Sequence, residues 1–334
     1  MVKRIARGAL NFTGSCYYRL LASEPVWRHR NRGARREYLR HPAKLAAAEE
    51  AAARSLDEQG IALAHISDFF GPGVFDELSS YVRRRWQDPA VQAEVAPHTA
   101  ILAGTGPKGG VKKAFLVNLW AGEAAEGPLK PMLDLAHPFT RFSISGPVLR
   151  VVNAYLGMFS KFRAWRLEAT IPMPSAGRAA SSQRWHRDPE DQKLVKAFLY
   201  LNDVDPAAGP FMYLRRSHLG GKWRDLFPMT PPAGSPRLPP GANEGELIPK
   251  EDVLVSTGRA GTMIFCDTSG LHKGGFALER ERLMYTSVHT TGASFSPIRY
   301  RYPSGFQLPA DLSRDARFAL INDPDQREPK YYRS

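Results

Sequence analysis

The second half of this chain carries many short apolar segments, and this pattern constrains its fold more than any other feature. Seven such segments follow residue 161, and turns separate each from the next. Helices do not alternate regularly with them, which speaks against a parallel sheet and predicts an antiparallel sandwich or barrel. The seven predicted strands span residues 162–173, 182–188, 195–204, 210–216, 252–257, 261–267 and 282–291.

The first half of the chain reads mainly as helix. Residues 43–59 are rich in Ala, Leu, Glu and Arg, and Gly60 ends this predicted helix. We expect further helices at 72–86 and, in two pieces split around Ser145, at 132–157, with strands at 61–70 and 112–120. These helices would pack outside the barrel, so we predict a mainly β protein with α-helices and one domain over residues 46–310.

Residues 219–250 stand apart because they hold seven prolines and five glycines. Such a long segment without regular structure is uncommon in a compact domain, and it is often a binding loop. We therefore expect a lid over a site, and the alternative is a plain insertion loop. Residues 311–334 read as a polar C-terminal tail.

The N-terminal residues form a basic arm. Residues 1–42 hold ten Lys and Arg against two acidic residues, a net +8 of the chain's +13. We predict a partly helical arm over 1–45 that can dock on an anionic membrane surface, and a solvated leader is the alternative. The start is a poor signal peptide, and the chain has only two cysteines, so a cytoplasmic, membrane-peripheral protein is expected.

His186 and Asp188 lie two residues apart in the sequence WHRD. On a strand, positions i and i+2 point the same way, so the imidazole and the carboxylate can bind one ion. Trp185 and Arg187 would then point to the opposite side and be structural. The His-x-Asp pair is weak on its own, because chance readily supplies it.

His272 is the best candidate for a third ligand. It follows an apolar strand and a glycine turn, and Arg282 begins the next predicted strand ten residues later. Two histidines and one carboxylate form the facial triad of non-haem Fe(II) oxygenases, which leaves the other metal positions open. A buried arginine suits a bidentate carboxylate, such as that of a dicarboxylic cosubstrate.

With these segments the chain resembles the phytanoyl-CoA dioxygenase family of Fe(II)- and 2-oxoglutarate-dependent oxygenases. The resemblance covers roughly residues 55 to 295 and lies in WHRD, FLYLNDVDPAAGPFMYLRRSH, GTMIFCDTSGLHKGG and RERLMYTSVH. It implies a double-stranded β-helix, a jelly-roll or cupin-like barrel with supporting helices from the N-terminal half. It also implies His186, Asp188 and His272 as iron ligands, with 2-oxoglutarate and O₂ as cosubstrates.

The same resemblance assigns the cosubstrate contacts. Arg282 would bind the distal carboxylate of 2-oxoglutarate, because it starts the last barrel strand, whereas Arg280 lies at the fraying end. If that strand alternates, Arg282 shares a face with Met284 and Thr286. Gln183 is a weaker candidate, since strict alternation turns it away from the metal.

Other charged and histidine residues have a structural alternative that we favour. Lys112, Lys113 and Asn118 could reach the cosubstrate, but a surface position explains them as well. His218 and His289 are expected to be packed rather than metal-bound. Basic residues that could line the mouth for an anionic substrate are Arg184, Arg187, Lys193, Lys196, Arg215 and Arg216.

The predicted function is an Fe(II)- and 2-oxoglutarate-dependent dioxygenase that hydroxylates a C–H bond of a small organic substrate. The carboxylate at Asp188 speaks against a halogenase, which needs an open position there. One alternative is a non-catalytic basic protein that docks on an anionic membrane or on nucleic acid through its arm, although no specific nucleic acid is expected. Another alternative is a different cupin-type metalloenzyme, which would need no arginine after the last histidine.

Overall fold

Two antiparallel sheets form the body of the protein. The computed structural model describes residues 23–102, 115–119, 133–172, 181–226, 238, 244–294, 298–302 and 304–320. The larger sheet has six strands in the order β1 (Ile61–His65), β7 (Thr262–Cys266), β4 (Leu194–Tyr200), β9 (Arg282–Thr290), β3 (Lys161–Thr170) and β2 (Leu116–Asn118). The smaller sheet has three strands in the order β6 (Val253–Ser256), β5 (Phe211–Leu214) and β8 (His272–Gly274).

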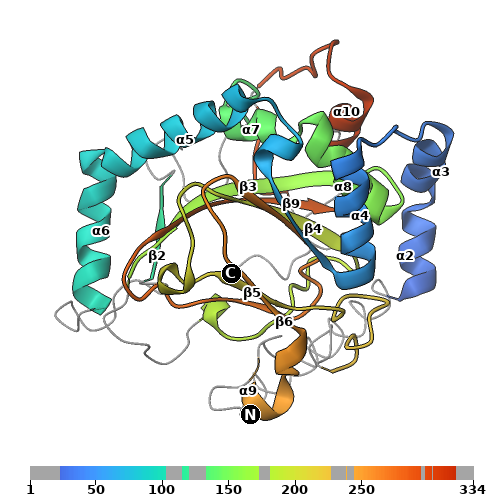
Figure 1. The fold of residues 1–334 in the computed structure, drawn as a ribbon. Helices are drawn as coiled ribbons and strands as arrows, with labels where there is room; N and C mark the ends of the chain where they lie inside the picture. Colours follow the sequence, from blue (N-terminus) through green and yellow to red (C-terminus); the bar gives the residue numbers. More distant parts are fainter. Residues whose placement is uncertain are drawn as a thin grey trace, which may run out of the picture.

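The smaller sheet lies under the larger one, and most helices cover the outer side of the larger sheet (Figure 1). Strands β4 and β9 are paired along their length, from Leu194 opposite Thr290 to Tyr200 opposite Met284. All strand pairs are antiparallel. The predicted double-stranded β-helix with supporting helices is therefore confirmed.

The main hydrophobic core lies between the large sheet and its helices. Leu167 and Tyr285 point outward from neighbouring strands and pack with helix residues such as Phe139 and Val151. Alternation sends the next residues of the same strands to the inner face. The core therefore occupies the outer face and leaves part of the inner face free for polar side chains.

The predicted helices are present with shifted ends. Helix α4 (Ala47–Gln59) ends at Gly60, whose φ of 79° is the left-handed conformation that glycine adopts without strain. Helices α5 (Pro72–Gln87), α7 (Pro138–Ser143) and α8 (Gly146–Leu156) follow the predicted order. Helix α6 (Pro89–Leu102) was not predicted, because Pro97 inside it obscures the helical pattern.

The basic arm is joined to the barrel by its two helices, α2 (Glu24–Arg30) and α3 (Arg32–Arg40). The buried Trp27 donates its indole N–H to Asp191, at 2.7 Å. Asn31 donates to the Thr291 hydroxyl at 3.0 Å and accepts from the Ala293 amide at 3.0 Å. Residues 24–40 are thus part of the folded body, while 1–22 lie outside the described residues and membrane docking stays a prediction.

Two strand predictions differ from the structure. Residues 182–188 form no strand: a 3-10 turn covers Ser181–Gln183, and His186 makes only an isolated bridge to His272. The predicted strand 61–70 ends at His65, because a 3-10 turn (Ile66–Asp68) begins there. Pro189 ends the first segment soon after the bridge, since proline cannot donate to a ladder.

The other connections are short helices and turns. The proline-rich segment 219–250 is described only at 219–226, 238 and 244–250, where α9 (Glu244–Leu247) lies, so its predicted role as a lid falls mostly outside the described residues. The tail contains α10 (Arg314–Leu320), which packs beside α8 and β3. Among the described residues, no helix has the length and apolar character needed to cross a membrane.

Substituting Trp27 by Phe is expected to lower the free energy of unfolding by about 1–3 kcal/mol, because buried Asp191 loses one of its hydrogen-bond donors. Urea unfolding followed by circular dichroism measures this loss. An unchanged midpoint would contradict a structural role for the arm helices.

The buried His289 gives the protein a predicted pH dependence. Burial lowers its pKa from 6.5 to about 3, so the folded state keeps the ring neutral while the unfolded chain gains a proton as pH falls below 6.5. Because the unfolded chain takes up a proton at His289, this residue should lower the free energy of unfolding by about 2 kcal/mol as the pH falls to about 5. His289→Asn should flatten the curve of unfolding free energy between pH 7.5 and 5, and an equally steep curve would contradict this.

Candidate active site

A pair of backbone hydrogen bonds brings the predicted metal ligands together. The His186 amide donates to the His272 carbonyl, and the His272 amide donates back to the His186 carbonyl, both at 3.0 Å. Two residues on, the Asp188 amide donates to Thr268 at 2.8 Å. The segment before β4 is thereby held against the start of β8, although it is not a regular strand.

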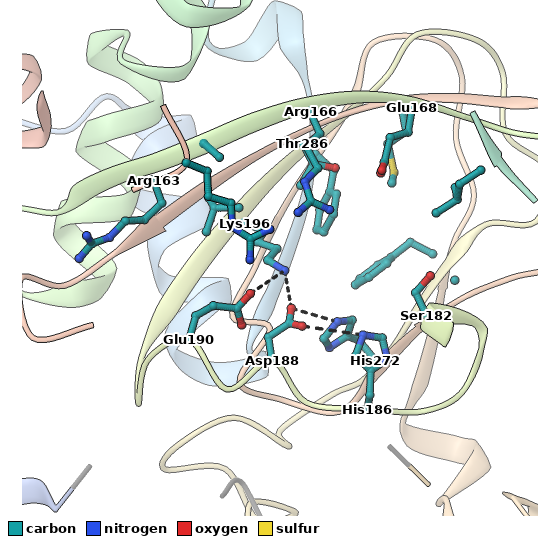
Figure 2. A pocket seen from close by; sticks show the side chains of 18 of the residues that line it. Arg163, Arg166, Glu168, Ser182, His186, Asp188, Glu190, Lys196, His272 and Thr286 are labelled. Atoms are coloured by element: carbon teal, nitrogen blue, oxygen red, sulfur yellow. Dashed lines mark hydrogen bonds and ion pairs between the residues drawn. The ribbon is translucent and has the colours of Figure 1, made fainter. Parts of the chain in front are cut away.

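The three side chains converge on one point. One ligand atom from each of His186, Asp188 and His272 lies within 4.8 Å of the other two. The Asp188 carboxylate lies 3.8 Å from His186 Nε2 and 3.3 Å from His272 Nε2 (Figure 2). Among the described residues no other group of three such side chains comes together in this way.

Both imidazoles are oriented by the same local device. His186 Nδ1 lies 2.8 Å from the carbonyl of Arg184, and His272 Nδ1 lies 2.9 Å from the carbonyl of Gly270. A carbonyl only accepts, so each Nδ1 carries the proton and each Nε2 presents its lone pair to the site. Backbone bonds of this kind fix the ring orientation of metal-binding histidines.

Lys196 balances the negative charge of the site. Its ammonium lies 2.5 Å from Asp188 and 3.9 Å from Glu190. Burial by itself raises the pKa of the Asp188 carboxyl, but the opposing charges around it, of which the Lys196 ammonium is the largest, hold this pKa well below its usual value. Asp188 is therefore a carboxylate, as a metal ligand must be.

This donor set fits a divalent transition metal. Two neutral imidazole nitrogens and one carboxylate oxygen match the facial triad of non-haem iron sites. The three groups are buried or nearly so, and their backbone is fixed before any metal binds. The structure thus brings together the three residues predicted as ligands, in an arrangement that could hold Fe(II).

The triad opens into a cavity of about 330 Å³ between the two sheets. Strand β9 contributes every second residue to its wall, namely Arg282, Met284, Thr286 and Val288, as the alternation predicts. From β3 come Arg163, Ala164, Arg166 and Glu168, and from the region of the triad come Ser182, Glu190 and Lys196. A metal at the triad would therefore face a polar chamber.

Arg282 is buried in the wall of this chamber. Its guanidinium donates to the carbonyl of Gly209 and, at 3.1 Å, to the hydroxyl of Thr170. Its Nε is buried and has no hydrogen-bond partner among the described residues. Burial lowers the pKa of Arg282 because desolvation disfavours its positive charge, and an anion in the chamber would offset this effect. Arg280, the rejected alternative, is exposed and pairs with Asp205.

Gln183 does not take the predicted place. It is buried in the 3-10 turn before the triad and does not line the cavity, whereas its neighbour Ser182 does. The prediction assumed a strand here, and the turn changes the direction of the side chain. Asn118 is exposed on β2 outside the cavity lining, and Lys112 and Lys113 lie outside the described residues.

The remaining histidines are packed, as expected. His218 lies 3.0 Å from the carbonyl of Asp57, and His289 lies 3.0 Å from the hydroxyl of Ser287. Neither lines the cavity.

Of the six basic residues proposed for the mouth, only Lys196 lines the cavity. Arg187 instead donates to four backbone carbonyls and holds loops together, which supports its structural role. The other four bond elsewhere: Arg184 to Leu238, Lys193 to Tyr155, Arg215 to Glu251 and Arg216 to Asp252. The sequence analysis missed Arg166 and Glu168, although their spacing on a predicted strand was visible.

No protein-family model and no curated protein matches this sequence, so the resemblance to phytanoyl-CoA dioxygenases is not confirmed. Several solved structures are similar in fold. EctD from S. alaskensis, crystallised with 2-oxoglutarate and 5-hydroxyectoine, is 15% identical with a TM-score of 0.49, over 79% of this chain and 91% of that one. The epimerase SnoN, in complex with Fe³⁺, alpha ketoglutarate and nogalamycin RO, is 17% identical with a TM-score of 0.46, over 80% and 93%.

AviO1 from Streptomyces viridochromogenes Tue57 is 16% identical with a TM-score of 0.44, over 76% of this chain and 100% of that one. Similarity this low says nothing about what this chain binds. The chemistry of the site therefore depends on the site residues themselves.

A divalent metal should stabilise the folded protein through the triad. At a concentration about 100 times Kd, Mn(II) would add about 2.7 kcal/mol to the free energy of unfolding. His272→Ala should lose this gain, while the matched variant His218→Asn, which changes a buried histidine outside the cavity, should keep it. Thermal unfolding with and without Mn(II) measures the difference, and an equal gain in His272→Ala would contradict the site.

Proposed function

We propose that this protein is an Fe(II)- and 2-oxoglutarate-dependent oxygenase that hydroxylates a C–H bond of a small organic molecule. One observation carries the proposal: His186, Asp188 and His272 converge in the same cavity that holds the buried Arg282. A metal site alone would fit many cupin-type enzymes. The buried arginine in the same chamber favours an anionic ligand beside the metal.

The three ligands would hold the metal by one face. His186 and His272 offer Nε2 lone pairs, because their Nδ1 atoms are engaged with backbone carbonyls, and Asp188 offers a carboxylate oxygen. When bound there, Fe(II) would supply O₂ activation coupled to the oxidative decarboxylation of 2-oxoglutarate. The carboxylate of Asp188 fills the position that a halogenase would leave to a halide.

Arg282 would bind the far carboxylate of 2-oxoglutarate. A guanidinium presents several N–H groups in a plane and suits a carboxylate better than a point charge does. The Gly209 carbonyl and the Thr170 hydroxyl hold the guanidinium in place from the protein side. A carboxylate would also compensate a buried charge that no described acidic residue pairs with directly.

The walls of the chamber would exclude water from the reacting groups. Phe198 and Phe211 both line it, with ring centroids 4.9 Å apart. Phe211 also lies 5.6 Å from the ring of His272. A dry wall strengthens the electrostatic contacts inside the site and shields reactive species from side reactions.

A non-catalytic docking protein is the weaker alternative. It would use the basic N-terminal residues and would leave the buried triad and Arg282 without a role. A variant that lacks residues 1–22 only distinguishes the two proposals. Turnover of 2-oxoglutarate that is retained in this variant would favour the oxygenase. A larger deletion would remove Trp27 and Asn31 from the folded body.

Arg282→Gln should weaken 2-oxoglutarate binding about 100-fold, since a charge-assisted contact is lost in a buried site. The control Arg280→Gln should bind as the parent does, because Arg280 is exposed and paired with Asp205. Anaerobic calorimetry of the Fe(II)-loaded protein gives both affinities. If the Arg282→Gln protein binds 2-oxoglutarate as tightly as the parent, the assignment of the cosubstrate site is wrong.

A further inference from the structure

Two charged side chains of the cavity, Arg166 and Glu168, have no direct partner in the described part of the chain, although Arg166 acts electrostatically on Lys196 and Glu168 on Arg282. Arg166 and Glu168 both line it from β3, and neither makes a hydrogen bond or an ion pair with another described residue. The other charges around them are engaged. Lys196 pairs with Asp188 and Glu190, and Arg163 donates to Thr290 and Thr291.

The backbone of β3 fixes where the two free charges lie. Arg166 is paired with Thr286 and Glu168 with Met284 on β9, so both point to the inner face together with those two cavity residues. Leu167 between them points into the core on the other side. Positions i and i+2 of a strand lie about 6–7 Å apart, which sets the spacing of the two side chains.

The two charged ends do not meet. Figure 2 shows Arg166 and Glu168 hanging from β3 into the cavity with their ends apart, across the chamber from His186, Asp188 and His272. Arg166 extends toward the side of Lys196, and Glu168 lies on the far side of Thr286 from it. A guanidinium and a carboxylate held apart over a metal triad can each receive a group of opposite charge.

We propose that the cavity binds a compact zwitterion as its substrate, such as an amino acid. The substrate's carboxylate would pair with Arg166, and its ammonium or other cationic group would pair with Glu168. This inference rests on the proposed oxygenase function, because it places the substrate opposite the metal triad and leaves Arg282 to the cosubstrate. Each of these two side chains would then receive the ligand group of opposite charge.

The size of the chamber agrees with a small substrate. At about 330 Å³ it lies near the lower end of the range of about 300–1,000 Å³ for ligand pockets. A cosubstrate and a substrate would share this volume. Arg166 is exposed and Glu168 is half-buried, so each opposite-charge contact should contribute a factor of about three to ten to affinity.

The test is ligand-observed NMR on the full chain loaded with Zn(II), a diamagnetic substitute for Fe(II), and saturated with 2-oxoglutarate. The probes are the proteinogenic amino acids, each with its decarboxylated amine and its N-acetyl derivative. At least one amino acid should bind about threefold or more tightly than both of its singly charged derivatives. If the amines or the N-acetyl derivatives bind as tightly as the amino acids, the proposal is overturned. The absence of binding by any amino acid would also overturn it.

Two variants assign each charge. Arg166→Gln should remove the advantage of the amino acid over its amine, and Glu168→Gln should remove its advantage over the N-acetyl form. The control variants Glu50→Gln and Arg54→Gln change an exposed ion pair on α4 and should leave both advantages intact. If Glu168→Gln weakens 2-oxoglutarate as much as the amino acid, Glu168 supports Arg282 instead and the proposal fails.

The affinity for 2-oxoglutarate, measured without any amino acid, separates this inference from the proposed function. If 2-oxoglutarate binds and no zwitterion is preferred, only the substrate inference falls. If 2-oxoglutarate does not bind but zwitterions keep both advantages, the oxygenase proposal falls and the role of Arg166 and Glu168 stands.

Discussion

The site depends on one short antiparallel bridge, in which His186 and His272 exchange backbone hydrogen bonds. These residues are 86 positions apart in the sequence, and the bridge sets both imidazoles on one side. Asp188 follows at the next same-side position and is anchored by its own bond to Thr268. The barrel therefore acts as a frame that holds one irregular segment against the edge of its smaller sheet.

Charge organises the rest of the chamber around that bridge. Lys196 compensates Asp188 and Glu190 at one end, and Arg282 stands at the other, hydrogen-bonded to a backbone carbonyl and a hydroxyl and acted on electrostatically by Glu168. A buried guanidinium without a direct acidic partner is costly, so a site of this kind favours an anion. Arg166 and Glu168 on β3, which make no direct hydrogen bond or ion pair with a described residue, are the proposed place for a second, zwitterionic ligand.

Those parts of the site that depend on the two-residue repeat of a strand could be predicted from local sequence patterns. The spacing of His186 and Asp188 and the alternation of Arg282, Met284 and Thr286 needed only the two-residue repeat of a strand. Gln183 was misplaced because a 3-10 turn replaces the strand, and no local signal marks that turn.

Contacts between distant segments could not be read from the sequence. The pairing of Lys196 with Asp188 depends on how β4 folds back beneath the triad segment. The face of β3 that looks inward depends on its irregular register at Phe162 and Ala164. Trp27 is buried against Asp191, which lies 164 positions away in the sequence. Counting the charges of the arm could not predict this contact.

The central claim is that the triad and Arg282 form one site, and the thermodynamic coupling of their ligands tests it most directly. Anaerobic calorimetry would measure 2-oxoglutarate binding with and without Fe(II), and Fe(II) binding with and without 2-oxoglutarate. A shared site predicts that each ligand tightens the other by the same factor, about tenfold or more. Affinities that are independent of each other would place the two ligands in separate sites and contradict the account.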